Sequence, residues 1–109
     1  MEVLEKIKEQ VESNPVIIYM KGTPAMPMCG FSSRTAEVLK KCEREFAFVN
    51  VIANPDIFEH LPSYADWPTF PQVYVGGELI GGCDITVEMF EKGELAPMVQ
   101  AAVDAKAAQ

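Results

Sequence analysis

Apolar and polar residues along the chain are arranged in helical stripes and short continuous apolar runs. Within residues 2–13 the apolar side chains recur at one helical spacing, which predicts a helix that ends before Pro15. The run at 16–20 is rich in β-branched residues and apolar throughout, which is typical of a central strand covered on both faces. A second helical stripe follows over residues 29–44, and the apolar run at 46–52 predicts the next strand. This order favours a right-handed parallel βαβ unit.

Prolines and glycines shape the middle of the chain. A short helix is expected over residues 54–64. The segment 67–71 must be an irregular loop rather than regular secondary structure, because its prolines have no amide donors. The short segments at 72–75 and 78–80 flank a two-glycine spacer at 76–77, which tolerates the positive φ of a tight hairpin turn. These two strands should therefore pair antiparallel.

The last third of the chain is predicted to be helical. A helix is expected over residues 85–92, with Asp84 as its N-cap and Gly93 as its stop, and a final amphipathic stripe begins at Leu95. The complete order is α-β-α-β-α-β-β-α-α, with no internal repeat or linker. A chain of 109 residues fits one domain, residues 1–109, and the order resembles a thioredoxin-like α/β layout.

Composition and charge narrow the possible partners. Nine Lys and Arg against 16 Asp and Glu give a net charge of −7, which disfavours attraction to nucleic acid or anionic lipid, so no nucleic acid and no membrane is expected. The longest apolar run is five residues, against the roughly 20 of a membrane-spanning helix. Three cysteines, an odd number, fit a reducing compartment. With no secretory or transit pattern, a cytoplasmic protein is expected, unless a leader has been removed.

Cys29 closes a proline-rich loop and opens the second predicted helix. A sulfur at that position should lie near unpaired backbone N–H groups and the positive end of the helix dipole, and Lys21 at the other end of the loop adds a cation. Thiols in such environments have a pKa lowered into the range of roughly 3.5 to 7.5. The plain alternative is a buried helix-cap cysteine, but the flanking loop favours a reactive sulfur.

No second thiol stands one helical turn from Cys29 to resolve a disulfide on it. Ser32 stands where a thioredoxin-type Cys-x-x-Cys motif has its resolving cysteine. Cys42 follows on the same predicted helix at a distance of about 20 Å, well beyond the roughly 7 Å limit between the Cα atoms of a disulfide, and is expected in the core. A mixed disulfide on Cys29 must therefore be released by an external thiol.

Several separated motifs together resemble one family. In chain order they are KGTP at 21–24 with Pro27, CGFS at 29–32, WPTFPQ at 67–72 and GGCD at 81–84. They resemble the signatures of the monothiol glutaredoxins of the Cys-Gly-Phe-Ser type, over about residues 3–98. The resemblance implies a thioredoxin-like glutaredoxin fold with a four-stranded mixed sheet of order 2-1-3-4 flanked by helices. It also implies bound glutathione and a 2Fe-2S cluster held between two subunits.

The resemblance also implies roles for individual residues. Cys29 is the implied catalytic sulfur and the one metal ligand of each chain, so that two chains and two glutathione thiolates supply the four ligands that such a cluster usually takes. The residues implied around glutathione are Lys21, Cys29, Phe31, Thr69, Phe70, Pro71, Cys83 and Asp84.

Each end of glutathione has an implied partner. The backbone of Phe70, in a loop with cis-Pro71, pairs with the ligand's cysteine. The N–H groups of Cys83 and Asp84 bind the γ-glutamyl carboxylate, the Asp84 side chain takes the ammonium, and Lys21 takes the glycyl carboxylate. A role for Cys83 as a further reactive thiol is the less favoured alternative to a place in the pocket wall.

Phe58 is a departure from the family pattern, because many relatives carry Arg at this position. The glycyl end of glutathione would then be held by Lys21 alone, which predicts looser glutathione binding unless His60 or another group reaches over. A Phe58→Arg variant should therefore bind glutathione more tightly.

Three functions are compatible with these residues. The leading interpretation is a homodimer, bridged by a glutathione-ligated 2Fe-2S cluster, that delivers the cluster to apo iron-sulfur acceptor proteins in cluster trafficking and iron homeostasis. One alternative is a glutathione-dependent thiol-disulfide oxidoreductase that acts through Cys29 alone. The other is a regulatory heterodimer with a BolA-like protein, again by resemblance.

Overall fold

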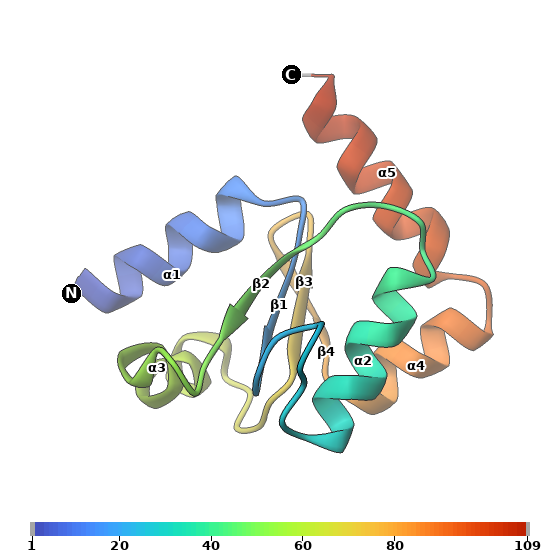
Figure 1. Ribbon diagram of the computed structural model, residues 1–109. Helices are drawn as coiled ribbons and strands as arrows, with labels where there is room; N and C mark the ends of the chain where they lie inside the picture. Colours follow the sequence, from blue (N-terminus) through green and yellow to red (C-terminus); the bar gives the residue numbers. More distant parts are fainter. Residues whose placement is uncertain (1, 109) are drawn as a thin grey trace.

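A four-stranded mixed sheet forms the centre of the structure, a computed structural model that describes residues 2–108 (Figure 1). The strands are β1 (Val16–Met20), β2 (Ala47–Asn50), β3 (Gln72–Val75) and β4 (Glu78–Gly81). Their spatial order is β2-β1-β3-β4, with β1 parallel to β2, and with antiparallel pairing of β1 with β3 and of β3 with β4. The expected α/β layout, with a four-stranded mixed sheet of order 2-1-3-4, is confirmed.

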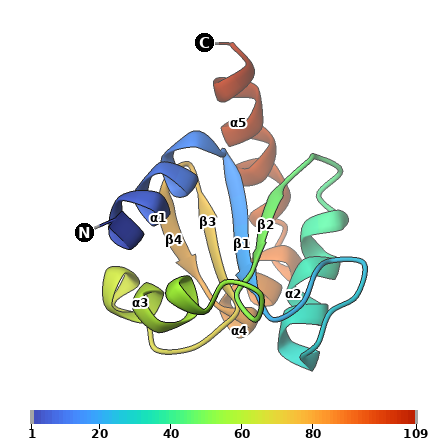
Figure 2. The same cartoon turned by 60° about the vertical axis from the view of Figure 1, so that its left-hand side comes forward.

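Helices cover both faces of this sheet. They are α1 (Glu2–Ser13), α2 (Gly30–Lys40), α3 (Pro55–Ala65), α4 (Cys83–Glu91) and α5 (Leu95–Ala107). Helices α1 and α3 lie on one face, and α2, α4 and α5 lie on the other (Figures 1 and 2). Among residues 2–108, none of the helices combines the length and the apolar character needed to cross a bilayer.

Strand β1 is buried along its whole length because it contributes to both cores. Ile17 and Tyr19 pack with α1 and α3, whereas Val16, Ile18 and Met20 pack in the cluster under α2, α4 and α5. Successive side chains of a strand point to opposite faces, so a strand with helices on both sides must be apolar throughout. This explains the uninterrupted apolar run that predicted the strand.

Helix α2 ends at Lys40, earlier than the expected end near residue 44, and β2 is shorter than the expected run. The N–H groups of Cys42 and Glu43 donate to carbonyls three residues back, and Glu43 has a φ of +62°, which reverses the chain toward β2. Cys42 therefore lies in the turn after α2 rather than on the helix itself. It is fully buried, as expected.

The expected N-cap of α4 was wrong: the helix begins at Cys83 with Gly82 as its N-cap, and Asp84 lies inside the first turn. The reason is the close packing of Gly82 against the loop before β3. A Cβ at Gly82 would lie only 3.1 Å from the carbonyl oxygen of Pro71. The absence of a side chain therefore lets the start of α4 approach this loop.

Gly22 closes the loop that precedes α2, and this position should not accept a side chain. Its φ is +91°, and an added Cβ would lie 2.5 Å from the carbonyl oxygen of Met26 and 2.6 Å from the backbone nitrogen of Met28. We expect Gly22→Ala to lower the free energy of unfolding by about 2–4 kcal/mol in denaturant titrations. Gly30→Ala, where nothing lies within 4 Å of the added Cβ, should change it by less than about 1 kcal/mol. Equal stability of the two variants would contradict this loop geometry.

Candidate functional site

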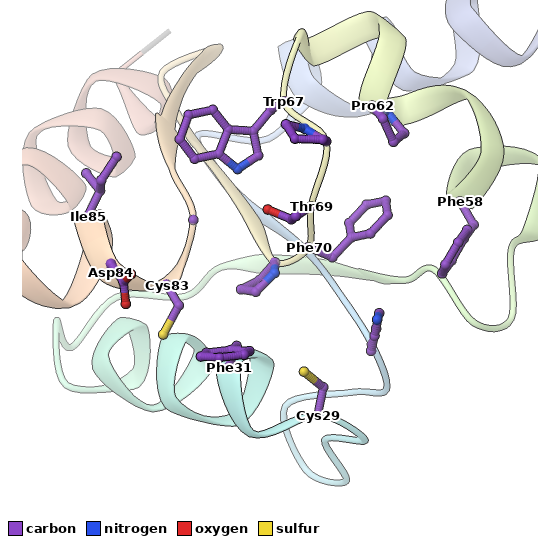
Figure 3. Close-up of a pocket in the computed structure, with 14 residues that line it drawn as sticks. Cys29, Phe31, Phe58, Pro62, Trp67, Thr69, Phe70, Cys83, Asp84 and Ile85 are labelled. Atoms are coloured by element: carbon purple, nitrogen blue, oxygen red, sulfur yellow. The ribbon is translucent and has the colours of Figure 1, made fainter.

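A pocket of about 710 Å³ lies between the start of α2, the loop before β3 and the start of α4 (Figure 3). All eight residues that the sequence analysis placed around a ligand line this pocket, although they come from three separate segments of the chain. The lining residues are Lys21, Cys29, Phe31, Phe58, Pro62, Trp67, Pro68, Thr69, Phe70, Pro71, Gly82, Cys83, Asp84 and Ile85.

Backbone hydrogen bonds hold the loop that precedes Cys29. Thr23 and Met26 exchange two backbone hydrogen bonds of 3.2 and 3.1 Å, and the N–H of Met28 donates to the carbonyl of Lys21 at 2.9 Å. Cys29 then takes the N-cap position of α2 with an extended backbone, and its own carbonyl accepts the N–H of Ser33. The loop thus positions a partly exposed sulfur at the first turn of a helix.

The pKa of the Cys29 thiol is lowered from its ordinary value, chiefly by the backbone N–H of Ser32. Burial opposes this effect, while the N–H of Phe31, the positive charge of Lys21 and the hydroxyl of Ser32 add to it. Unpaired N–H groups at a helix start stabilise a thiolate in this way. The direction agrees with the expectation from the sequence.

Ser32 also has a structural contact that the sequence did not predict. Its side chain is fully buried, and its Oγ accepts the backbone N–H of Lys21 at 3.1 Å. The hydroxyl at the position of a resolving thiol therefore ties the far end of the loop to the helix start. This contact keeps Lys21 and Cys29 at the same end of the pocket.

The second wall of the pocket is the loop 67–71, in which the peptide bond between Phe70 and Pro71 is cis. Gln72, fully buried at the start of β3, holds this loop through its Nε2, which donates to the carbonyls of Trp67 at 3.0 Å and Thr69 at 3.3 Å. The cis bond was expected only from the family resemblance. The role of Gln72 was missed, although a polar residue that opens an apolar strand was a visible signal.

The start of α4 forms the end of the pocket opposite Phe58 (Figure 3). Cys83 is buried and Asp84 is exposed, and both lie in the first helical turn. A helix N-terminus offers backbone donors to an anion, and the Asp84 carboxylate beside it can accept from a cation. This end can therefore bind a group that has both a carboxylate and an ammonium.

A model of the glutaredoxin family matches residues 16–80 of the chain. The chain belongs to the glutaredoxin family. It is also 53% identical, over 100 residues, to a protein of Haemophilus ducreyi named glutaredoxin 4, an alignment that covers 92% of this chain and 94% of that protein. With Ser32 in place of a second cysteine, the chain is a monothiol glutaredoxin.

Solved glutaredoxin structures have the same fold. The holo form of glutaredoxin C1 from Populus tremula × tremuloides superposes with a TM-score of 0.82 at 30% identity, covering 94% of this chain and 90% of that one. A buckwheat glutaredoxin-glutathione complex superposes with a TM-score of 0.80 at 27% identity, covering 93% and 90%.

The glutaredoxin pocket includes residues that the sequence analysis did not assign to it. Pro62 and Phe58 lie one turn apart on α3, so their common face was readable from helical spacing once Phe58 had been noticed. No local sequence signal assigns Ile85 to the pocket, because the position of its side chain depends on how α4 packs. His60 does not line the pocket: its Nδ1 lies 2.9 Å from the carbonyl oxygen of Asp56 on the same helix.

A metal cluster at this site would require ligands from outside the chain. Within residues 2–108 no three His, Cys, Asp or Glu side chains gather closely enough to hold a metal ion. All three cysteines are free thiols, of which Cys42 and Cys83 are buried, and burial raises the pKa of Cys42. Cys29 is the partly exposed one, with the lowered pKa, and it fits the role of a single thiolate ligand.

The lowered pKa of Cys29 is testable by alkylation with iodoacetamide, followed at each cysteine by mass spectrometry. We expect the alkylation rate of Cys29 to rise at a lower pH than the alkylation rate of an ordinary thiol does. Lys21→Met should move this rise to higher pH, because the thiolate loses a neighbouring positive charge. The exposed Lys8, on α1, serves as the control, and Lys8→Met should leave the curve unchanged. A wild-type curve like that of free cysteine would contradict the stabilised thiolate.

Proposed function

We propose that this monothiol glutaredoxin binds glutathione in the pocket and, as a cluster-bridged homodimer, receives a 2Fe-2S cluster and delivers it to apo iron-sulfur proteins of the cytoplasm. The observation on which this rests is a partly exposed thiol at Cys29 with a lowered pKa, in a pocket with opposite charges at its two ends. A single thiolate can neither close a disulfide within the chain nor hold a cluster by itself.

The distribution of charge along the pocket supports glutathione as the ligand. Glutathione has a carboxylate and an ammonium at its γ-glutamyl end, a carboxylate at its glycyl end and a thiol between them. The start of α4 with Asp84 suits the first end, and Lys21 suits the second. The cis-Pro71 loop lies between the two ends and beside Cys29, where the backbone of Phe70 can pair with the ligand's cysteine. The buckwheat relative solved with glutathione has the same fold.

The number of available thiolates supports a shared cluster. A 2Fe-2S cluster usually takes four ligands, and two copies of the chain supply two Cys29 thiolates. Two glutathione thiolates complete the set, and because these ligands are diffusible, the cluster is transferable cargo. Met26, Met28 and Phe31 are 77%, 67% and 63% exposed next to Cys29. A second copy seated there would cover these apolar side chains.

The lowered pKa of Cys29 also supports a second candidate function, glutathione-dependent deglutathionylation. The Cys29 thiolate would attack the glutathione sulfur of a protein mixed disulfide, form a disulfide with glutathione and release the protein as a thiolate. A second glutathione thiolate would then attack this disulfide, release Cys29 and form oxidised glutathione.

The BolA-like partner remains an expectation from the family resemblance.

Anaerobic reconstitution with ferrous iron, sulfide and glutathione tests the carrier function. We expect the wild-type chain to form a coloured dimer that reverts to colourless monomer when a chelator removes the iron. Cys29→Ala should stay colourless and monomeric, because each half of the site loses its protein ligand. Cys42→Ala removes a buried thiol outside the pocket and should still form the dimer. Iron content and light scattering report the outcome, and a Cys29→Ala protein with wild-type iron would contradict the proposal.

The Ser32→Cys variant distinguishes the carrier function from the oxidoreductase function. A thiol one helical turn from Cys29 would displace glutathione from the mixed disulfide within the chain, so turnover of a glutathione mixed disulfide should rise several-fold. Cluster retention should fall, because oxidation of the new pair removes the ligand thiolate. Ser33→Cys adds a thiol at the adjacent position of α2 and is the control. Fast wild-type turnover, with no gain in Ser32→Cys, would favour the oxidoreductase.

A further inference from the structure

Two aromatic rings form an apolar wall at the Lys21 end of the pocket. Phe58 from α3 and Phe70 from the loop before β3 lie with their ring centroids 5.3 Å apart at an interplanar angle of 39°. Pro62, one turn after Phe58 on α3, extends the same wall. We call the Phe58 and Phe70 pair the aromatic wall; Figure 3 shows both rings on the side of the pocket away from Asp84.

The core does not require an aromatic residue at position 58. The buried residues of α3 are Ile57 and Leu61, which pack in the cluster under α1, whereas Phe58 is 40% exposed. Phe70 packs against that cluster, and the ring of Phe58 packs against the ring of Phe70. The ring of Phe58 is therefore held in place while much of its surface faces water, and a ligand that covered it would bury apolar area.

The charges at this end of the pocket are few. Among the described residues that line the pocket, Lys21 is the only cation. Helix α3 adds none: the Asp56 carboxylate pairs with Lys6 at 3.3 Å, and the ring of His60 contacts the Asp56 backbone outside the pocket. One cation beside an apolar wall suits a ligand end that has one carboxylate and an apolar side chain.

We propose that the aromatic wall is a specificity subsite for the C-terminal residue of the bound thiol peptide, and that it favours an apolar side chain there. The inference rests on the proposed binding of glutathione, which puts the C-terminal carboxylate at Lys21. The glycine of glutathione has no side chain to cover Phe58. The preferred ligands are therefore γ-glutamylcysteinyl peptides with an apolar C-terminal residue, and Phe58 is the residue that determines the preference.

Calorimetric titration of the reduced protein with three peptides tests this specificity. The peptides are glutathione, γ-glutamylcysteinyl-leucine and γ-glutamylcysteinyl-asparagine. The last residue of glutathione is smaller than those of the other two peptides, and leucine and asparagine differ mainly in polarity. We expect the leucine peptide to bind roughly tenfold more tightly than glutathione, since its side chain buries apolar area on Phe58. The asparagine peptide should bind no more tightly than glutathione.

Variants of two phenylalanines locate the effect. Phe58→Ala should abolish the advantage of the leucine peptide. Phe48→Ala should retain it, because Phe48 is similarly exposed, at 46%, but lies on β2 outside the pocket. Phe58→Arg should strengthen binding of all three peptides, because a second cation faces the C-terminal carboxylate that they share. It should also abolish the advantage of the leucine peptide, because the substitution removes the apolar ring.

The outcomes distinguish this inference from the function on which it rests. Glutathione binding without a leucine advantage, or an advantage that survives Phe58→Ala, overturns the aromatic subsite and leaves the proposed function intact. If wild-type protein binds none of the three peptides, the proposed glutathione site itself is wrong, and the subsite fails with it.

Discussion

The first turn of α2 is the constraint on which the rest of the site depends. A helix start leaves backbone N–H groups without partners inside the helix, and here the N–H groups of Ser32 and Phe31 stabilise the Cys29 thiolate. The buried Ser32 hydroxyl uses its oxygen to hold the backbone of Lys21. One short segment thus lowers the pKa of the sulfur and holds the backbone of Lys21 beside it.

In the proposed function, a thiolate stabilised in this way, with no second thiol in its own helical turn, depends on molecules from outside the chain. Thiol exchange needs a second sulfur, and a cluster needs further ligands, so in the proposed function the protein's chemistry is shared with a diffusible thiol peptide and with another subunit. The pocket walls supply charge and shape for such a peptide, and they take no part in bond making. Glutathione therefore serves in this proposal as a ligand for the metal as well as a substrate.

Much of this architecture was predictable because the strands and motifs have strong local signals. The apolar run of β1 and the paired glycines of the hairpin predicted strands that the structure contains. The ends of helices were less predictable. The end of α2 depends on the positive φ of Glu43, which follows from the path to β2, and the start of α4 depends on the approach of Gly82 to Pro71. Both are tertiary effects that local propensity does not contain.

The residues of the site also divide into those that the sequence could assign and those that it could not. Residues within motifs, such as Cys29 and Asp84, could be assigned from the sequence, because the fold brings the segments that carry the motifs together around one pocket. Ile85 could not, since the face that a helix turns toward a pocket depends on its packing. Gln72 was missed because its contacts join a side chain to the backbone of a loop of irregular shape.

Besides Phe58 and Pro62 of α3, the pocket consists of segments near residues 21–31, 67–71 and 82–85, which meet only when the whole chain is folded. A small molecule that contacts all three binds the folded protein and has no comparable site on the unfolded chain. Binding therefore raises the stability of the domain by mass action, by an amount that grows with the ratio of the ligand concentration to its Kd. Because proteases degrade the unfolded fraction, the lifetime of the protein should increase with the cellular concentration of its ligand.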